Sequence, residues 1–189
     1  MKLKIASAAF LLAAIGASAP VAASEIQDAA RDYVKENLAA ALAAPEVAAA
    51  IKAQNQKNAG LSQADVDALD QRWRAGDAGI IEATLSNELS QYLAEVVQAN
   101  GGVVTELFVM DSKGLNVGQS DRTSDYWQGD EAKWRETYLA GPDAIHISDV
   151  EEDESTQTFQ VQVSVSISEG GAAIGAATIG IDVGALESL

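Results

Sequence analysis

The spacing of apolar residues changes near Asn100 and divides the chain into two halves. Before this point apolar residues recur at steps of three and four, which places them on one face of a helix. After it apolar and polar residues alternate, as they do in a strand with one buried face. Helices followed by strands predict an α+β fold with an antiparallel sheet. The longest helical stripe predicts a single long helix and consists of Ile81, Leu85, Leu89, Leu93, Val96 and Val97.

The helical half also carries start and stop signals. Pro45 can open a helix, because the N–H group that proline lacks has no partner at a first helical position. Ser62 and Asp65 have the spacing of a capping box, and Asn100 with the two glycines after it is a helix stop. We therefore predict several N-terminal helices over residues 24–100.

Residues 101–189 contain the predicted sheet. The clearest strand spans residues 159–167, where apolar residues at the odd positions alternate with Gln and Ser. Residues 121–141, which are richer in Trp, Tyr and charge, are expected to form a loop and a short helix. We treat residues 24–189 as one domain, since this length suffices for one core. The other predicted strands are 103–110, 115–119, 144–150 and 172–183.

The first 23 residues have the three parts of a secretory signal peptide. Two lysines at the start are followed by an almost unbroken apolar run over residues 5–19 and then by small residues up to Ala23. We predict cleavage after Ala23, so that a soluble mature protein begins at Ser24 in the periplasm. The alternative, a membrane anchor, is disfavoured because the run is shorter than the ~20 apolar residues of a spanning helix.

Charge and cysteine content narrow the range of partners. The chain has 12 Lys and Arg against 28 Asp and Glu; without Lys2 and Lys4 the mature chain has 10 against 28, a net charge of −18. Such a chain repels nucleic acid and anionic membrane surfaces, which bind through Lys and Arg. The absence of cysteine excludes disulfides and thiol chemistry. Acidity by itself indicates solubility and identifies no ligand.

Catalytic motifs are missing from the sequence. It contains no serine-hydrolase elbow, no zinc-protease helix and no phosphate loop. His146, the only histidine, is predicted to face away from Ile145 and Ile147 on a strand, and no nucleophile is placed beside it. We therefore expect a protein that is not an enzyme and that uses no metal and no cofactor.

Two acidic clusters have a structural interpretation. Asp65, Asp67 and Asp70 lack the glycine and the terminal glutamate of an EF-hand loop, so we expect them on a solvated helix face. Residues 151–154 are all acidic and are expected to form a charged surface turn. Weak calcium binding is the alternative for this second cluster.

The second half of the chain resembles the Cache family of extracytoplasmic sensor domains. The likeness covers about residues 103–189 and depends on the order and spacing of several short pieces, with Trp134 and Tyr138 in the same pattern. Residues 123–134 look like a sub-group of stand-alone periplasmic members. The matching pieces are Val109-Met110-Asp111-Ser112-Lys113-Gly114, Asp125-Tyr126-Trp127, Ile147-Ser148-Asp149 and Ile179-Gly180-Ile181-Asp182-Val183-Gly184-Ala185-Leu186.

The resemblance implies a PAS-like sheet of five antiparallel strands, in which the last strand lies between the first and the fourth. One face of this sheet packs on the long helix. The other face, together with the loop after the second strand, encloses a small-molecule pocket.

The residues that bind the ligand in amino-acid-binding members carry over in part. The aromatic positions correspond to Tyr126 and Trp127, and the acidic positions to Asp149 and Asp182. The arginine that often precedes the aromatic pair does not carry over, because a Ser-Asp pair stands there and Arg122 lies out of register. The resemblance therefore does not imply that this chain binds an amino acid.

We predict that these four residues line one pocket on the sheet face away from the helices. Asp182 is expected on the same face as the small residues Ala176, Thr178 and Gly180, which leave room for a ligand. Two carboxylates and two aromatic rings suit an amine-bearing ligand, through charge-assisted hydrogen bonds and cation–π contacts. The alternatives are that Asp182 caps the following turn and that Trp127 fills the core.

Two functions are consistent with these features. One is a periplasmic binding and sensing module that captures a small polar, amine-bearing ligand and presents it to a membrane receptor. The other is a structural or interaction protein whose pocket is closed and whose N-terminal helices form a homodimer. A cavity beneath Trp127 favours the first function, and a filled sheet face favours the second.

Overall fold

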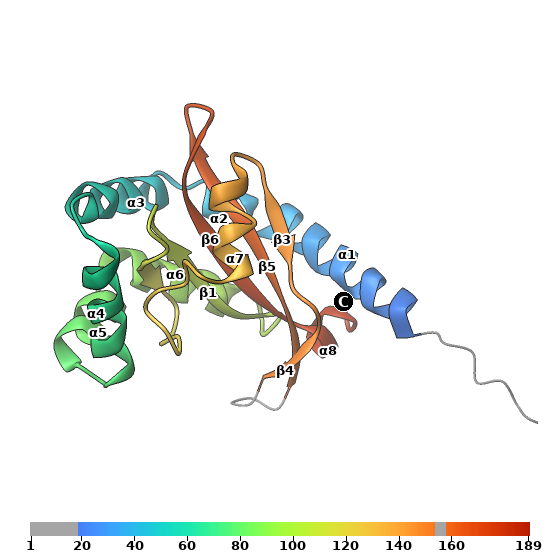
Figure 1. The fold of residues 1–189 in the computed structure, drawn as a ribbon. Coiled ribbons are helices and arrows are strands. Elements are labelled where there is room, and N and C mark those ends of the chain that lie inside the picture. The colour runs from blue at the N-terminus through green and yellow to red at the C-terminus, as the bar shows by residue number, and fades with distance from the viewer. Residues whose placement is uncertain (1–18, 154–157) are drawn as a thin grey trace, which may run out of the picture.

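The computed structural model describes residues 19–153 and 158–189, which form a layer of helices on an antiparallel sheet (Figure 1). The predicted leader lies mostly outside the described residues, and its last residues begin the first helix. None of the described helices is long and apolar enough to cross a membrane. The helices before the sheet are α1 (Ala19–Asn37), α2 (Ala39–Leu42), α3 (Pro45–Asn58), α4 (Gln63–Arg74), α5 (Ala78–Leu85) and α6 (Glu88–Ala99).

The sheet has the order β2-β1-β6-β5-β3, with β4 also paired to β5, and every pair is antiparallel. The last strand therefore lies between the first and the long alternating strand, as the resemblance to Cache domains implies. This topology confirms the predicted α+β fold. The strands are β1 (Val104–Met110), β2 (Asn116–Gln119), β3 (Ile145–Ile147), β4 (Glu151–Asp153), β5 (Thr158–Glu169) and β6 (Ala172–Asp182).

The predicted third strand, residues 144–150, is reduced to β3, and an additional strand, β4, follows it, so the sheet has six strands instead of five. Ile147 of β3 lies opposite Val163, Glu151 of β4 lies opposite Gln160, and residues 148–150 separate the two strands. The prediction of a surface turn is therefore wrong for residues 151–153. Their backbone pairs with β5, while the side chains of Glu151 and Glu152 stay exposed to water.

The predicted long helix is also divided, into α5 and α6, although the apolar stripe runs through both. The break occurs at Asn87, whose side-chain oxygen accepts the backbone N–H of Ser90 (2.8 Å) and caps α6. The Asn87 amide also donates to the carbonyl oxygen of Val117 on β2 (2.9 Å). One asparagine thus ends the continuity of the helix and ties it to the sheet.

Other start signals are confirmed. Pro45 is the first residue of α3. Ser62 and Asp65 form the predicted capping box, in which Ser62 accepts the N–H of Asp65 (3.3 Å) and Asp65 accepts the N–H of Ser62 (2.9 Å).

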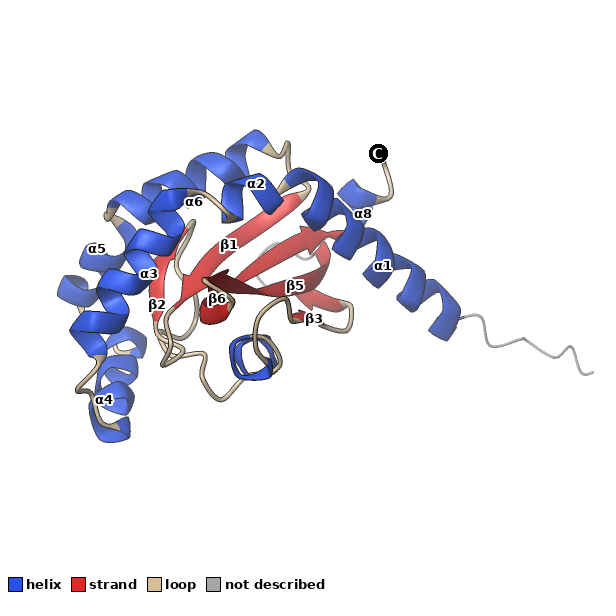
Figure 2. Cartoon of the chain, turned by 90° about the horizontal axis from the view of Figure 1, so that it is seen from above, coloured by secondary structure: helices blue, strands red, loops and turns tan. Residues whose placement is uncertain are grey.

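The two faces of the sheet are covered differently (Figure 2). Helices α1, α2, α3 and α6 lie over one face. On the opposite face, Phe108 and Met110 pack against Trp134, which belongs to the short helix α7 (Ala132–Arg135), next to the 3-10 helix η1 (Tyr138–Ala140). The core on the helical side includes Leu107, Val109, Val161, Val163, Ile179 and Ile181.

Candidate functional site

Residues 125–127, which were predicted to cover a pocket and are called the aromatic segment below, are held against α4. Tyr126 is buried and stacks on Trp73, with 5.3 Å between the ring centroids. Trp73 is completely buried, and sequence reasoning did not identify it. Arg122 donates to the Trp73 carbonyl oxygen (2.8 Å) and places its guanidinium 5.5 Å from the centre of the indole ring. Arg122 therefore stabilises this aromatic cluster.

Asp70 of α4 fixes the backbone of the same segment. Its Oδ1 atom accepts hydrogen bonds from the backbone N–H groups of Tyr126 (2.9 Å) and Trp127 (3.1 Å). The expectation of a solvated helix face is therefore wrong for Asp70, which is 7% exposed. The sequence contained a signal for this burial, because Asp70 lies four residues after Val66 and three before Trp73, on the buried stripe of α4.

A cavity of about 400 Å³ lies beside Tyr126, between α3, α5 and β2, and is called the Tyr126 pocket below. Its volume and its mixture of apolar and polar residues are typical of small-molecule sites. The apolar lining consists of Leu61, Leu69, Ile80, Ala83 and Val117. The polar lining consists of Gln54, Lys57, Asn58, Thr84, Asn87 and Tyr126.

A buried carboxylate holds two of these polar side chains in place. Asp111, which is 0% exposed, accepts hydrogen bonds from the side-chain amides of Asn58 (2.8 Å) and Gln54 (3.1 Å). It also accepts the backbone N–H groups of Lys113 (2.8 Å) and Leu115 (3.0 Å), so the turn after β1 is fixed to α3. Because these bonds already order the two amides, a ligand that contacts them loses little affinity to side-chain ordering.

The lining of the Tyr126 pocket presents a hydrogen-bond donor and a positive charge to a ligand. Burial raises the pKa of the Tyr126 hydroxyl; a hydrogen bond with Thr84 lowers it, and the negative charge of Asp111 raises it. The hydroxyl is therefore protonated at neutral pH, and it can donate to a ligand that replaces Thr84 as its hydrogen-bond partner. Lys57 adds an ammonium group to the lining, and this group makes no hydrogen bond or ion pair with a described residue.

Trp127 is directed elsewhere. Its Nε1 atom donates to the carbonyl oxygen of Lys113 (2.8 Å). The side chain borders a separate, shallow hollow beside Asp67, Arg74 and Asp130. Trp127 and Tyr126 are thus neighbours in the sequence that contribute to different cavities.

Asp149 and Asp182 lie toward the other end of the sheet. Asp182 is the last residue of β6, and its Oδ1 atom accepts the N–H of Ala185 (2.7 Å), which caps the short helix α8 (Val183–Leu186). Ala176 of β6 pairs with Met110, near the aromatic segment, and six residues of strand separate Ala176 from Asp182, or about 20 Å. Asp149 is exposed after β3. The four predicted residues do not come together, and their binding of a ligand stays a prediction.

The room that was predicted beside Gly180 is filled. A methyl group at Gly180 would approach Thr105 Oγ1 to 2.5 Å and Glu106 Cγ to 2.6 Å. Next to it, the Ser164 and Thr178 hydroxyls are buried and 3.0 Å apart. Side chains of the strands themselves therefore occupy this part of the sheet face.

The described residues offer no metal site, since no group of three His, Cys, Asp or Glu side chains among them is placed to hold an ion. His146 lies opposite Ser164 in the sheet, and its Nδ1 atom is 2.9 Å from Glu136 Oε2. This pair links β3 to the segment after α7.

No protein-family model and no curated protein sequence matches the chain. Solved structures with similar folds include the sensory domain of the Campylobacter jejuni chemoreceptor Tlp3, with 13% identity and a TM-score of 0.45 over 87% of this chain and 59% of that chain. The ligand-binding domain of the Pseudomonas fluorescens chemoreceptor CtaA, in complex with L-alanine, has 7% identity and a TM-score of 0.42 over 90% and 60%. The sensor domain of the V. cholerae histidine kinase DctB has 15% identity and a TM-score of 0.39 over 89% and 59%. The chain thus spans about three fifths of the length of these domains.

Proposed function

We propose that the protein is a binding and sensing module for a small polar molecule, which it holds in the Tyr126 pocket. The observation that carries this proposal is the pocket itself, where a buried tyrosine hydroxyl and ordered amides face the same cavity. The proposal keeps Tyr126 as a ligand-binding residue. It assigns Asp70 and Trp73 the role of positioning Tyr126.

The lining favours a ligand with a carboxylate or another strong hydrogen-bond acceptor. Lys57 contributes a positive charge, and the Tyr126 hydroxyl contributes a donor. An amine-bearing ligand has less support in this pocket, because Asp149 and Asp182 lie elsewhere. Asp111 stands behind Asn58 and Gln54, whose amides already satisfy it.

The finer parts of the proposal concern location and signalling. We propose export through the leader at residues 1–23, a periplasmic location, and presentation of the complex to a membrane receptor, with no catalytic step. The leader pattern supports export. Asp70 offers a route to a receptor surface, because it accepts the Tyr126 N–H and also pairs with the exposed Arg74 of α4 (2.7 Å).

A thermal-shift screen of the exported, processed protein tests this function. The panel contains small carboxylates, zwitterions and polyamines, since a ligand that binds only the folded state raises the melting temperature. We expect a carboxylate to give the largest shift and Lys57→Gln to weaken its binding about tenfold. Arg135→Gln removes the same charge from an exposed site and is the control.

Two results oppose the proposal. If no compound shifts the melting temperature, the result favours the alternative of a structural or interaction protein whose pocket is closed. If a compound binds equally well to wild type, Lys57→Gln and Tyr126→Phe, the ligand site is not the Tyr126 pocket.

A further inference from the structure

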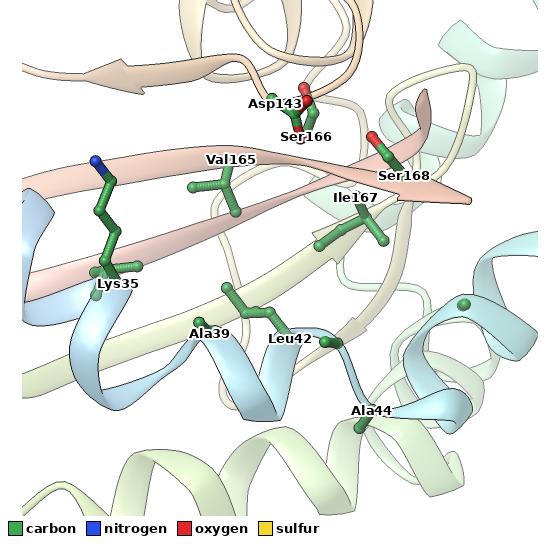
Figure 3. Close-up of a pocket in the computed structure, with 12 residues that line it drawn as sticks. Lys35, Ala39, Leu42, Ala44, Asp143, Val165, Ser166, Ile167 and Ser168 are labelled. Atoms are coloured by element: carbon green, nitrogen blue, oxygen red, sulfur yellow. The ribbon is translucent and has the colours of Figure 1, made fainter. Parts of the chain in front are cut away.

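A second hollow, the edge groove, lies at the opposite edge of the sheet, between the first three helices and β5 (Figure 3). Its volume is about 360 Å³. The helical wall includes Lys35, Ala39 and Leu42, and the strand wall includes Asp143, Val165 and Ile167. Since β2 and β3 are the two ends of the strand order, this groove is separate from the Tyr126 pocket beside β2.

Beside the groove one apolar side chain is exposed and its neighbour is half-buried. Ile145 pairs with Val165 in register, so both side chains are on the helical face of the sheet, yet Ile145 is 38% exposed. The helical wall opposite them is largely alanine, whose short side chains do not extend over the strand. Strand β3 begins only at Ile145, so the end of β5 is an edge of the sheet. An unpaired sheet edge beside an exposed apolar residue is open to contact with a second molecule.

Each wall carries one charge of opposite sign. Lys35 stands on the helical wall and Asp143 on the strand wall, and neither makes a hydrogen bond or ion pair with a described residue. In Figure 3 the Lys35 side chain extends away from Leu42, and Asp143 lies on the other side of β5 from the helices. Both charged groups are therefore directed outward, where a second molecule can reach them.

We infer that the edge groove is the contact surface between two copies of this chain, related by a two-fold axis. In such a contact the helical wall of one copy faces the strand wall of the other. Each contact between two different residues therefore occurs twice, once on each side of the axis. Lys35 of each copy then faces Asp143 of its partner, and the alanine-rich wall covers Val165 and Ile145.

The overall charge of the chain supports this choice of surface. With a net charge of −16, two copies repel each other at most orientations. The edge groove carries one cation and one anion, so the local charges complement each other there. A two-fold arrangement is the one that pairs both charges in both copies.

Sedimentation equilibrium of the exported, processed protein tests the inference. We expect a monomer–dimer equilibrium in which Lys35→Asp and Asp143→Lys each weaken the dimer by at least about tenfold, because each places like charges together. The double variant Lys35→Asp with Asp143→Lys exchanges the charges and is expected to restore dimerisation to within about threefold of wild type. Arg135→Asp and Glu95→Lys, at exposed positions elsewhere, make the same charge changes and are expected to leave the equilibrium unaltered.

Asp143 has a positive φ of 63°, a backbone conformation that Asp and Asn tolerate better than Lys. Melting curves therefore accompany each variant, and Asp143→Asn removes the charge while keeping a suitable residue. The inference is overturned by a wild-type protein that stays monomeric up to about 1 mM. It is also overturned if Lys35→Asp and Asp143→Asn leave the dissociation constant of the dimer unchanged, or if the double variant dimerises no more tightly than the single variants. A monomer whose edge groove binds an apolar dye would assign the groove to a small ligand instead.

Discussion

The carboxylate of Asp70 accepts the backbone N–H of Tyr126 at 2.9 Å, a contact that connects two segments 56 residues apart in the chain. The same oxygen accepts the N–H of Trp127. The position of the aromatic segment therefore depends on α4. In turn, the aromatic segment supplies two of the hydrogen-bond donors to the buried Asp70 carboxylate. A ligand that displaces Tyr126 must also act on α4.

Replacing Asp70 by alanine is expected to lower the free energy of unfolding by about 1–3 kcal/mol, because two backbone N–H groups lose their acceptor. Urea denaturation of the protein measures the change. Asp67→Ala, an exposed position on the same helix, is the matched control and is expected to change stability by less than about 0.5 kcal/mol. Equal stability of the two variants would show that Asp70 is not needed to hold the segment.

Gly114 and Gly76 both have φ near 80°, but their surroundings differ. A methyl group at Gly114 would lie 2.6 Å from the backbone of Gly129, whereas at Gly76 it would meet nothing within 4 Å. Both alanine variants carry the cost of a left-handed residue, about 1–2 kcal/mol. We expect Gly114→Ala to lose at least about 1 kcal/mol more, from overpacking against the backbone of Gly129. Parallel denaturation curves of the two variants give the difference, and a difference near zero would contradict the close approach.

The sequence predicted the regular parts of this fold because local chemistry determines them. Proline opens α3, the capping box opens α4, and strict alternation marks β5. The division of the long stripe at Asn87 escaped prediction, since Val117, which fixes the Asn87 side chain, lies thirty residues away in the chain. Periodicity describes a helix face and does not show where a distant partner interrupts it.

The candidate site was harder to predict for the same reason. Tyr126 was among the residues predicted for a pocket, but its partners Trp73 and Asp70 belong to a helix whose packing partner was unknown. Asp182 shows the limit of arguments from strand faces. Its strand position predicts a residue on the sheet surface, whereas the alternative interpretation, a cap of the following turn, is the one confirmed, because an N-cap satisfies the carboxylate locally.

The cap at Asp182 gives a prediction that separates its two possible roles. Asp182→Ala is expected to cost about 0.5–2 kcal/mol, the usual loss for an N-cap, and Asp182→Asn much less, because asparagine also accepts the bond. Affinity for a ligand of the Tyr126 pocket is expected to be the same in both variants and in wild type. Calorimetric titration alongside denaturation measures both quantities. Loss of binding in Asp182→Asn, with stability retained, would return Asp182 to the ligand site.

The buried hydroxyl of Tyr126 makes stability depend on alkaline pH. Burial raises its pKa above the ordinary value of about 10, so the unfolded chain ionises first as the pH rises. The resulting stabilisation is present below about pH 10 and is lost as the pH rises through the pKa of the folded state. Burial raises the pKa of Tyr33 and Tyr92 as well, so Tyr126→Phe is expected to reduce the alkaline loss of stability without abolishing it.

Denaturation at intervals from about pH 8 to 11 measures this dependence, and ligand titration over the same range tests the role of the hydroxyl in binding. If the Tyr126 hydroxyl donates a hydrogen bond to the ligand, affinity falls in the pH range where the folded hydroxyl ionises. In Tyr126→Phe that fall is absent. Lys57 lines the same pocket, so the titration is repeated in Lys57→Gln, where the tyrosine hydroxyl acts without the ammonium group. A variant Tyr126→Phe with the same alkaline loss of stability as wild type would contradict the burial of the hydroxyl. A fall in affinity that is the same in wild type and in Tyr126→Phe would show that the hydroxyl donates no hydrogen bond to the ligand, and the tyrosine would then serve to shape the pocket.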